Sequence, residues 1–512
     1  MTSHRRSIRR VRACTLPTLA LAATLAGCAV GPDFNAPEVP VPADPSRPYT
    51  QLPMPAATAS APGRAGGSQR FVAEQDLPAM WWQLFHSEPL DALIRSALAQ
   101  SPTLAAAQAA LRQARENYAA DAGGRLLPSV SGQLGAQRER TSRATSGAAG
   151  VFNLYNATVD VSYTVDAFGG IRRELEGLQA ATDYQRYQVE ATYLTLVGNL
   201  VTTAIQEASL RARLQATHDV VDAEQKALAL VQTQARLGAI ARSSVLSQQS
   251  LLAQTVATIP PLEKQLAQTR QQLAVYAGRL PSDAAMPEFG LDALTLPAEL
   301  PVSLPSQLAR QRPDVRAAEA LLHEASAQVG VATANLYPQI NLSGSLGTQA
   351  LSPGKLFSSG NLAWSVASGL TQPIFNGGSL QAKRRAAIAA FDQAGAQYEQ
   401  TVLNAFLNVA DTLRALTSDA DALRAQADAE SLARQSLDIV NRQYKLGATS
   451  NLALLDAQRT YQQTRVGLAQ AQANRLADTA ALFQALGGGW WNREALTDIS
   501  PGASRGSVVA QP

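Results

Sequence analysis

The chain has 512 residues, a length that ordinarily indicates more than one domain. Charged residues make up 16% of it and aromatic residues 5%, and the formal net charge is +3. These values exclude the basic stripe of a nucleic-acid-binding protein and the polybasic patch of a membrane-surface protein, and they fit polar helices rich in alanine and glutamine.

The N-terminus has the form of a secretory signal peptide. A basic run precedes the apolar stretch Leu16 to Ala26, which is too short to span a bilayer. It ends in Leu25-Ala26-Gly27-Cys28, which resembles the bacterial lipobox, whose cysteine receives diacylglycerol and an N-acyl lipid and becomes the first mature residue. The alternative is an ordinary signal peptide with a chance cysteine. We expect residues 1–27 to be removed and Cys28 to be lipidated, and Ala29 in place of aspartate implies, by that resemblance, sorting to the outer membrane.

The next segment is rich in proline. Nine prolines stand between Gly31 and Gly67, which forbids a regular helix and favours an extended chain, so we expect residues 28–80 to form a lipid-anchored strap. An apolar stripe at helical spacing then predicts a helix from about Pro89 to Leu98. Ser101 is expected to cap a further helix that has Pro102 at its first position.

Two pairs of strands are predicted from alternating apolar and polar residues. The first pair is predicted at about residues 128–167. There, the apolar or aromatic residues Val159, Val161, Tyr163 and Val165 alternate along the chain with the polar residues Thr158, Asp160, Ser162 and Thr164. The second pair, at about 338–372, alternates in the same way from Ile340 to Leu346 and from Leu362 to Leu370. Each pair therefore reads as a hairpin with one apolar and one polar face.

Each hairpin is followed by paired glycines and then by a helical stretch without proline. These stretches, from about Ile171 to Arg236 and from about Leu380 to Lys445, would each reach roughly 100 Å at 1.5 Å per residue. Helices of this length need partners, and a heptad seam supplies a packing face through Val402, Val409, Leu416 and Leu423.

Both long helices are expected to end in a basic residue followed by a left-handed glycine, Gly238 in one case and Gly447 in the other. Returning helices are expected from about Arg242 to Ala277 and from about Asn451 to Leu486. The Pro260-Pro261 pair must kink or restart the first of them, and the second has no such break.

The predicted elements recur in one order, which indicates an internal duplication. Gly238 and Gly447 are 209 positions apart, and the Leu127-Pro128 and Tyr337-Pro338 steps are 210 apart. The expected organisation is a signal peptide at 1–27, the strap at 28–80, a first repeat at 81–281, a linker or equatorial segment at 282–311, a second repeat at 312–489 and a flexible tail at 490–512.

Four strands with one apolar face cannot close a barrel, and open sheet edges are not tolerated in hydrocarbon. Other copies must therefore supply the remaining strands. Three copies would give twelve strands, an even-numbered barrel with valine, leucine, tyrosine and tryptophan outward and small polar residues inward. The predicted fold class is mainly α with a membrane β-barrel, formed by a homotrimer and continued by a long periplasmic α-helical barrel.

Several motifs together resemble the TolC-like outer membrane factors, and in particular the OprM/NodT-type lipoproteins. They are the lipobox followed by Gly31-Pro32-Asp33-Phe34, Trp81-Trp82-Gln83-Leu84-Phe85, the run Arg312 to Glu319, and the run Leu454 to Arg459. The resemblance covers the chain from Cys28 to Gly487. It implies an outer-membrane, lipid-anchored exit channel of a tripartite efflux pump that extends into the periplasm, with a periplasmic adaptor and an inner-membrane transporter, most simply of the RND type, as partners.

The resemblance also implies a closed periplasmic tip just after the second glycine turn. It assigns the constriction to Leu452, Asp456 and Arg459, whose spacing of i, i+4 and i+7 places them on one helical face. In a trimer they would form a ring of leucines beside a ring of carboxylates, with Arg459 able to tether the closed state. The plainer interpretation is a solvated Asp and Arg on an ordinary helix. The corresponding positions of the first repeat hold only Ser243, Ser247 and Ser250.

By the same resemblance, the two tip turns receive the hairpin of the adaptor, although each is also explained as a plain helix terminator. The residues so assigned are Arg236, Leu237, Gly238, Ala239, Lys445, Leu446, Gly447 and Ala448.

Other function classes find less support. The histidines are isolated and neither a metal-spaced cluster nor a phosphate-binding loop appears, so we expect no enzyme, no metal site, no cofactor beyond the Cys28 lipid, and no nucleic acid partner. A trimeric surface coiled coil explains the heptads but not the hairpins. Within the channel class, the alternative to small-molecule efflux is a conduit for type I protein secretion. The sequence does not name the substrate, and copper or silver export lacks a methionine relay.

Overall fold

The computed structural model describes residues 29–37, 54–73, 75–142, 150–282, 286–302, 308 and 310–493. The chain divides into two compact units: Met1–Glu38, Ala109–Arg186 and Ala317–Glu399 form the first, and Val39–Gln108, Tyr187–Arg316 and Gln400–Pro512 form the second. The signal peptide, Cys28 and the tail beyond residue 493 lie outside the described residues.

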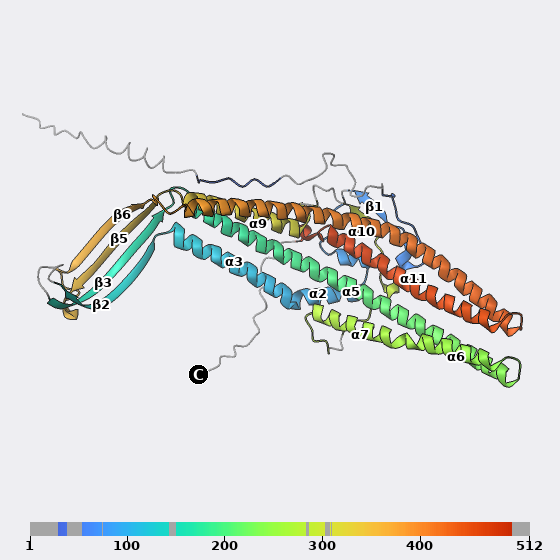
Figure 1. The fold of residues 1–512 in the computed structure, drawn as a ribbon. Helices are drawn as coiled ribbons and strands as arrows, with labels where there is room; N and C mark the ends of the chain where they lie inside the picture. Colours follow the sequence, from blue (N-terminus) through green and yellow to red (C-terminus); the bar gives the residue numbers. More distant parts are fainter. Residues whose placement is uncertain are drawn as a thin grey trace, which may run out of the picture. The chain divides into compact units, whose positions relative to one another are not determined.

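The helices and strands confirm the duplication (Figure 1). The first copy runs α2 (Glu88–Gln100), α3 (Pro102–Leu126), β2 (Ser129–Thr141), β3 (Gly150–Val165), α5 (Gly170–Arg236), α6 (Arg242–Ala257) and α7 (Ile259–Tyr276). The second runs α9 (Pro313–Ala334), β5 (Gln339–Ala350), β6 (Leu362–Thr371), α10 (Ser379–Lys445) and α11 (Asn451–Ala485). The order helix, hairpin, long helix, returning helix is therefore repeated, and the two long helices have 67 residues each.

The first unit contains one antiparallel sheet in the order β2-β3-β5-β6. Its register carries the predicted alternation across the strands, because residues paired directly opposite each other share a face. One face holds the pairs Val130–Val161, Val159–Leu346 and Leu346–Trp364. The other holds Ser131–Asp160, Asp160–Ser345 and Ser345–Ser365. The two predicted hairpins are thus confirmed, and they join into one sheet with an apolar and a polar face.

The sheet of the first unit is unfinished at both sides. Strands β2 and β6 stand at the ends of the order, and each pairs with one neighbour only among the described residues. The apolar face is uncovered in the single chain: Trp364 is 74% exposed and Val366 is 80% exposed. Exposed apolar patches and unpaired edges of this kind are protected in nature by further strands or by lipid.

Glycine and aspartate turn strand β3 into helix α5. Gly169 has φ +77°, and a Cβ there would lie 2.5 Å from the Ala29 backbone, so the position requires glycine. Asp166 then accepts hydrogen bonds from the backbone N–H groups of Ile171 and Arg172, at 3.1 and 3.0 Å, and so caps the first turn of α5. In the second copy, Gly377 and Gly378 have φ +61° and +82° before α10. The predicted glycine corners are confirmed.

The core of the second unit is built on aromatic residues. Trp81 and Phe85, on the short helix η2 (Trp81–Phe85), pack against Phe483 of α11, with ring centroids 5.5 and 6.4 Å away. All three side chains are fully buried. The predicted heptad seam is also buried, with Val402, Val409, Leu416 and Leu423 no more than 1% exposed. Helix α10 therefore presents its apolar stripe to the core, as amphipathic long helices do.

Two expectations need correction. The strap is not only an anchoring segment, because its residues Arg70–Ala73 form strand β1, which pairs in parallel with strand β4 (Glu299–Val302) of the predicted linker. The tail does not begin at residue 490, because Trp490–Asn492 forms a short helix whose Asn492 side chain donates to Asp76 and to the Leu77 carbonyl oxygen, both at 2.8 Å. The remaining short helices are Arg64–Gly66, Leu291–Ala293 and Pro353–Lys355.

The Pro260-Pro261 pair restarts the returning helix of the first copy. Helix α6 ends at Ala257 and α7 begins at Ile259, so both prolines lie in the first turn of α7. Proline is tolerated there because N–H groups in the first turn of a helix have no intrahelical acceptor, so the missing N–H breaks no hydrogen bond. Helix α11 of the second copy continues without a break over 35 residues. Among the described residues, no helix combines the length and the apolarity needed to cross a membrane.

Candidate functional site

The two predicted tip turns have the same backbone geometry. After α5, Gly238 has φ +74°, and the Ala239 N–H donates to the Gln234 carbonyl at 2.9 Å. After α10, Gly447 has φ +71°, and the Ala448 N–H donates to the Gln443 carbonyl at 2.8 Å. This six-residue closure is the Schellman motif, which satisfies the last carbonyls of a helix and reverses the chain.

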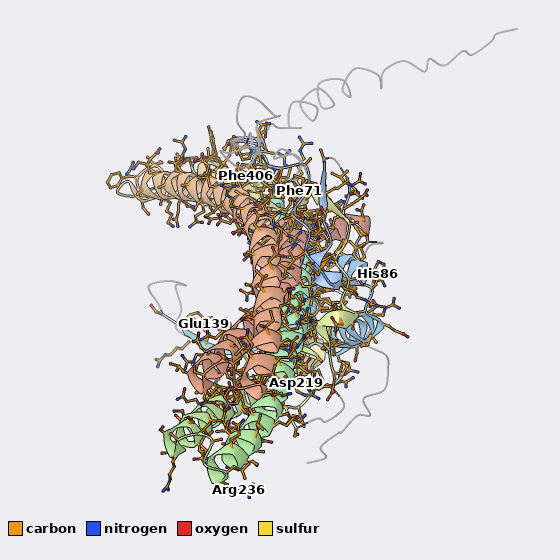
Figure 2. The ribbon with its side chains drawn as sticks, turned by 90° about the vertical axis from the view of Figure 1, so that its right-hand side faces the viewer. Phe71, His86, Glu139, Asp219, Arg236 and Phe406 are labelled. Carbon is orange, nitrogen blue, oxygen red and sulfur yellow. The ribbon has the colours of Figure 1, made fainter. Side chains whose placement is uncertain are left out.

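The same turns expose one large apolar side chain each. Leu237 is 80% exposed and Leu446 is 84% exposed, beside the exposed Arg236 and Lys445. Arg236 marks the end of α5 in Figure 2. An exposed leucine next to a flexible cation is a combination suited to docking, because it offers apolar area with a charged rim.

Beneath the turns, the ends of both copies share one small core. Val231 of α5, Tyr444 of α10 and Leu454 of α11 are buried together. The Tyr444 hydroxyl donates to Gln234 Oε1 at 2.9 Å, and burial raises the pKa of that tyrosine, so the hydroxyl stays a donor at neutral pH. The first turns of both returning helices are therefore held against the same cluster.

Helix α11 carries the predicted constriction residues on its exposed side. Ser450 caps the helix by accepting a hydrogen bond from the Ala453 N–H at 3.2 Å. From there Leu454 and Leu455 are buried, whereas Leu452, Asp456 and Arg459 are exposed, Leu452 at 73%. The three predicted residues are thus placed on one uncovered helical face, at i, i+4 and i+7.

The equivalent face of the first copy is uncovered too, but it differs chemically. Ser243, Ser247 and Ser250 are exposed on α6, in the places that Leu452, Asp456 and Arg459 take on α11. The two helices are joined below that face, where the buried Gln248 donates through Nε2 to Gln458 Oε1 at 3.3 Å. Only the second copy therefore offers an apolar residue and a pair of opposite charges to whatever the exposed face lines.

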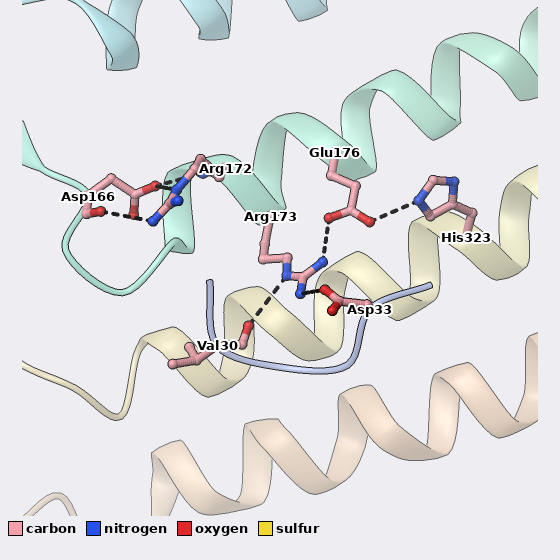
Figure 3. Close-up of polar contacts among 7 residues, drawn as sticks. All are labelled: Val30, Asp33, Asp166, Arg172, Arg173, Glu176 and His323. Carbon is pink, nitrogen blue, oxygen red and sulfur yellow. Dashed lines mark hydrogen bonds and ion pairs between the residues drawn. The ribbon is translucent and has the colours of Figure 1, made fainter. Parts of the chain in front are cut away.

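In the first unit, the segment just after Cys28 is bound to α5 and α9 through a buried arginine (Figure 3). Arg173 is 4% exposed; its guanidinium lies 2.6 Å from Asp33 Oδ1 and 2.7 Å from Glu176 Oε2, and its Nε donates to the Val30 carbonyl at 3.4 Å. Burial alone lowers the pKa of Arg173, but the two carboxylates outweigh it and raise that pKa. We call Arg173, Glu176 and His323 the clasp.

Histidine completes the clasp. His323 Nε2 lies 2.9 Å from Glu176 Oε1, and the Phe34 ring stacks on the imidazole with centroids 4.2 Å apart. The segment passes so close to α9 that a Cβ on Gly31 would meet the Gly330 backbone at 2.5 Å. Sequence reasoning treated His323 as isolated and missed the clasp; the Gly31-Pro32-Asp33-Phe34 motif was the signal that could have led to it.

The second unit holds buried charge that the sequence did not predict. Glu207 is fully buried; it accepts from Arg211 at 2.7 Å and from the Phe289 N–H at 3.0 Å. The i, i+4 spacing of Glu207 and Arg211 was the local sequence signal for this ion pair. On α11, burial and the neighbouring Asp419 raise the pKa of Asp478 to about 7, and burial lowers the pKa of Arg475 to about 10.

Arg475 is 1% exposed, and its guanidinium donates to the Leu416 carbonyl at 2.6 Å and to Thr58 Oγ1 at 2.5 Å. It thereby binds α10 and the strap segment to α11. These groups are structural contacts: in the described part of the chain, no group of three or more His, Cys, Asp or Glu residues could hold a metal ion.

The chain matches the family model described as outer membrane efflux protein over residues 93–279 and 304–488, once for each copy. It is 33% identical to the pyoverdine export outer membrane protein OpmQ of Pseudomonas putida, over 86% of this chain and 94% of that protein. It is 31% identical to the antibiotic efflux pump outer membrane protein ArpC of Pseudomonas putida, over 94% of this chain and 97% of that protein. Among solved structures, the outer-membrane channel OprN gives a TM-score of 0.81 at 28% identity, over 90% of this chain and 100% of that one. The outer membrane protein VceC of Vibrio cholerae gives a TM-score of 0.76 at 26% identity, over 80% of this chain and 99% of that one.

Proposed function

The chain belongs to the outer membrane efflux protein family, and on that premise we propose how its residues serve an efflux channel. The family is one of channels in the outer membrane, and the fold is the TolC-type combination of a β-barrel and a long α-helical barrel. The chain is the exit channel of an efflux pump. The finer assignments concern the trimer, its partners, the lipid anchor and the constriction.

The single observation that carries the proposal is the unfinished sheet. Its four strands end in two open edges and expose Trp364 and Val366 on one face, whereas Ser345 and Ser365 lie on the other. Three copies would pair these edges into twelve strands around a polar lumen, with the apolar face toward lipid. Such closure supports a homotrimer as the functional unit.

The pump partners are assigned to the tip turns. The exposed Leu237 and Leu446, beside Arg236 and Lys445, offer the surface on which a periplasmic adaptor would dock, with Gly238, Ala239, Gly447 and Ala448 completing the turns. The adaptor would connect the channel to an inner-membrane transporter of the RND type. Neither turn contains a catalytic constellation, and the channel conducts passively.

Cys28 is assigned the lipid anchor, from the lipobox that precedes it. The clasp supports this assignment, because it fixes the residues that follow Cys28 to the unit that carries the sheet, and a lipid at the mature N-terminus would then lie at a defined place. Mass spectrometry of the mature protein, and of Cys28→Ser, tests it: a mass without acyl chains in the wild type would remove the anchor.

Leu452, Asp456 and Arg459 are assigned the constriction. In a trimer, three copies of Asp456 would converge, attract cations and repel one another, and Arg459 would tether the closed state. We expect Asp456→Ala to raise single-channel conductance and to weaken block by divalent cations in planar bilayers. The matched control is Asp438→Ala on the exposed side of α10, and equal values for both variants would remove Asp456 from the constriction.

The physiological test separates efflux from protein secretion. Deleting the protein should raise cellular accumulation of an organic dye and leave the secreted-protein profile unchanged. Lost secretion with normal dye accumulation would overturn the assignment to small-molecule efflux and favour a type I secretion conduit.

A further inference from the structure

We infer that each chain holds a binding groove for small anionic amphiphiles, molecules with an aromatic or aliphatic body and a carboxylate or sulfonate, directly above the proposed constriction. The inference rests on the proposed function, because it deepens what the channel binds as substrate or blocker. The groove lies wholly in the second unit, between α5, the α6–α7 pair and α11.

The groove has the size and the lining of a ligand site. Its volume is about 870 Å³, within the range of roughly 300–1,000 Å³ that small-molecule pockets occupy. Apolar residues and glutamines both line it. The apolar residues are Leu251, Ala257, Pro261, Leu262, Val466 and Gly467, and the glutamines are Gln254, Gln265, Gln462, Gln463 and Gln470. Such a lining suits an apolar body with a few polar groups.

The charge of the lining has one sign. Arg213 and Arg459 are its charged members, and no acidic residue lines the groove. Arg213 Nη1 donates to the neutral Gln470 Oε1 at 3.3 Å, and among the described residues neither Arg213 nor Arg459 forms an ion pair with a carboxylate. A guanidinium without a carboxylate partner favours an anionic ligand, because its N–H donors form charge-assisted hydrogen bonds with carboxylate or sulfonate oxygens.

One acidic group lies behind the wall. Glu224 is fully buried, and its Oε1 accepts from the Thr255 hydroxyl at 3.1 Å. Burial raises the pKa of Glu224, although the Thr255 hydrogen bond opposes the rise, so its neutral form is favoured relative to a free glutamate. Repulsion of a bound anion from this side is therefore reduced.

Helical periodicity connects the groove with the exposed face of α11. Leu452, Asp456 and Arg459 lie along that face at i, i+4 and i+7, and Gln463 and Gln470 continue it at i+11 and i+18. Arg459 belongs to both sets. If the first three residues line the conduit, the floor of the groove faces the same space.

The opposite wall exists in the first copy alone. The restart of the helix at Thr258 and Pro261 places both residues in the lining, and α11 has no equivalent break. The groove is therefore a product of the asymmetry between the copies, and a trimer would contain one groove per chain.

The test uses 2-naphthalenesulfonate as the anionic probe and 2-naphthalenemethanol as its neutral match, applied to the full-length protein in planar bilayers. The sulfonate should block the current, and Arg213→Gln should raise its apparent dissociation constant by about tenfold, the value of one charged hydrogen bond. Arg213→Lys should restore part of the block. Block by the neutral probe should be the same in the wild type and in both Arg213 variants.

Two further variants separate a local site from general electrostatics. Gln463→Glu places a negative charge on the exposed floor and should weaken the block as Arg213→Gln does. Arg242→Gln removes one positive charge from α6 at a position half a turn away from the groove face, and should leave the block as in the wild type. Equal block of wild type, Arg213→Gln and Gln463→Glu, or equal block by both probes, would overturn the inference.

Failure of the proposed function would look different. A protein that is not a channel would conduct no current without any probe, and a type I secretion conduit would conduct current but leave dye accumulation unchanged on deletion. Efflux measurements in cells distinguish the two sources of the anion. If it is an exported substrate, Arg213→Gln slows its efflux; if it is a blocker from the periplasm, the same change makes efflux of a neutral dye resistant to it. Unchanged values in both measurements would refute a role in the conduit.

Discussion

The clasp allows a quantitative prediction about how the N-terminal segment is held. Arg173→Met keeps an apolar stem against Gly330 but removes every N–H donor from Val30 and Asp33. The Asp33 pair contributes less than about 1 kcal/mol, because the Asp33 side chain is 91% exposed and its charge is screened. The bond to Val30 and the loss of a partner for Glu176 add the remainder, for a total of about 2 kcal/mol.

Amide hydrogen exchange measures this change directly, because the Val30 N–H donates to the Phe168 carbonyl at 3.0 Å. A cost of about 2 kcal/mol corresponds to roughly 30-fold faster exchange of that amide by local opening. Asp33→Asn should accelerate it less than about fivefold. Arg125→Met, which removes a half-exposed cation paired with Glu174 in the same unit, serves as the control. Equal exchange in Arg173→Met and Arg125→Met would refute the reasoning, as would a larger effect of Asp33→Asn.

Three further predictions concern stability. The pKa of Asp478 is about 7 in the folded protein against 3.8 for the free group, so the folded state holds the proton more tightly and stability should fall as pH rises from about 4 to about 7; in Asp478→Asn the melting temperature should lose that decline, and an unchanged pH profile would contradict it. Gly447→Ala should lower the melting temperature by the equivalent of about 1 kcal/mol because φ is +71°, whereas Gly395→Ala, in open space on α10, should raise it; shifts of the same sign would argue against the turn geometry. Phe483→Ala should cost about 3–5 kcal/mol in denaturant unfolding, and the exposed Leu452→Ala close to none; similar costs would contradict the assigned core.

The repeated elements were predictable because their signals are local. The alternation that ends at Val165, the glycine corner at Gly169 and the terminator at Gly238 each lie within a few residues of the boundary they set. Both long helices were predicted within one residue of their observed ends, Arg236 and Lys445, since proline-free helical sequence is bounded by glycine on each side.

Contacts between distant residues were not predictable in the same way. Strand β1 finds its partner β4 229 positions further on, each strand has only four residues, and β4 contains Pro301, which argues against a strand. Arg173 meets Asp33 from 140 positions away. No local pattern encodes the β1–β4 pairing, and the Gly31-Pro32-Asp33-Phe34 motif contains one partner of the Arg173 contact without indicating the other. The exposed face of α11 could be predicted, because helical spacing alone places Leu452, Asp456 and Arg459 together, but their role in the conduit stays a proposal.

The contacts of α11 also indicate where that helix can move. Among the described residues, its first turns are held by neutral contacts only: the Gln458–Gln248 hydrogen bond at 3.3 Å, the Asn451 side chain at 3.5 Å from the Ser244 carbonyl, and the buried Leu454 and Leu455. Two long neutral hydrogen bonds and two buried leucines amount to roughly 4–9 kcal/mol.

The far end of α11 is held more strongly. Arg475 makes two charge-assisted hydrogen bonds, and Phe483 is enclosed by Trp81 and Phe85. Moving that end would leave a buried guanidinium unpaired, which costs more than a neutral bond. Any opening of the proposed constriction should therefore displace the segment from Asn451 to about Gln458 and leave the core around Phe483 in place. A partner shifts that balance if its binding to the tip turns favours one state by a free energy comparable to that of these contacts.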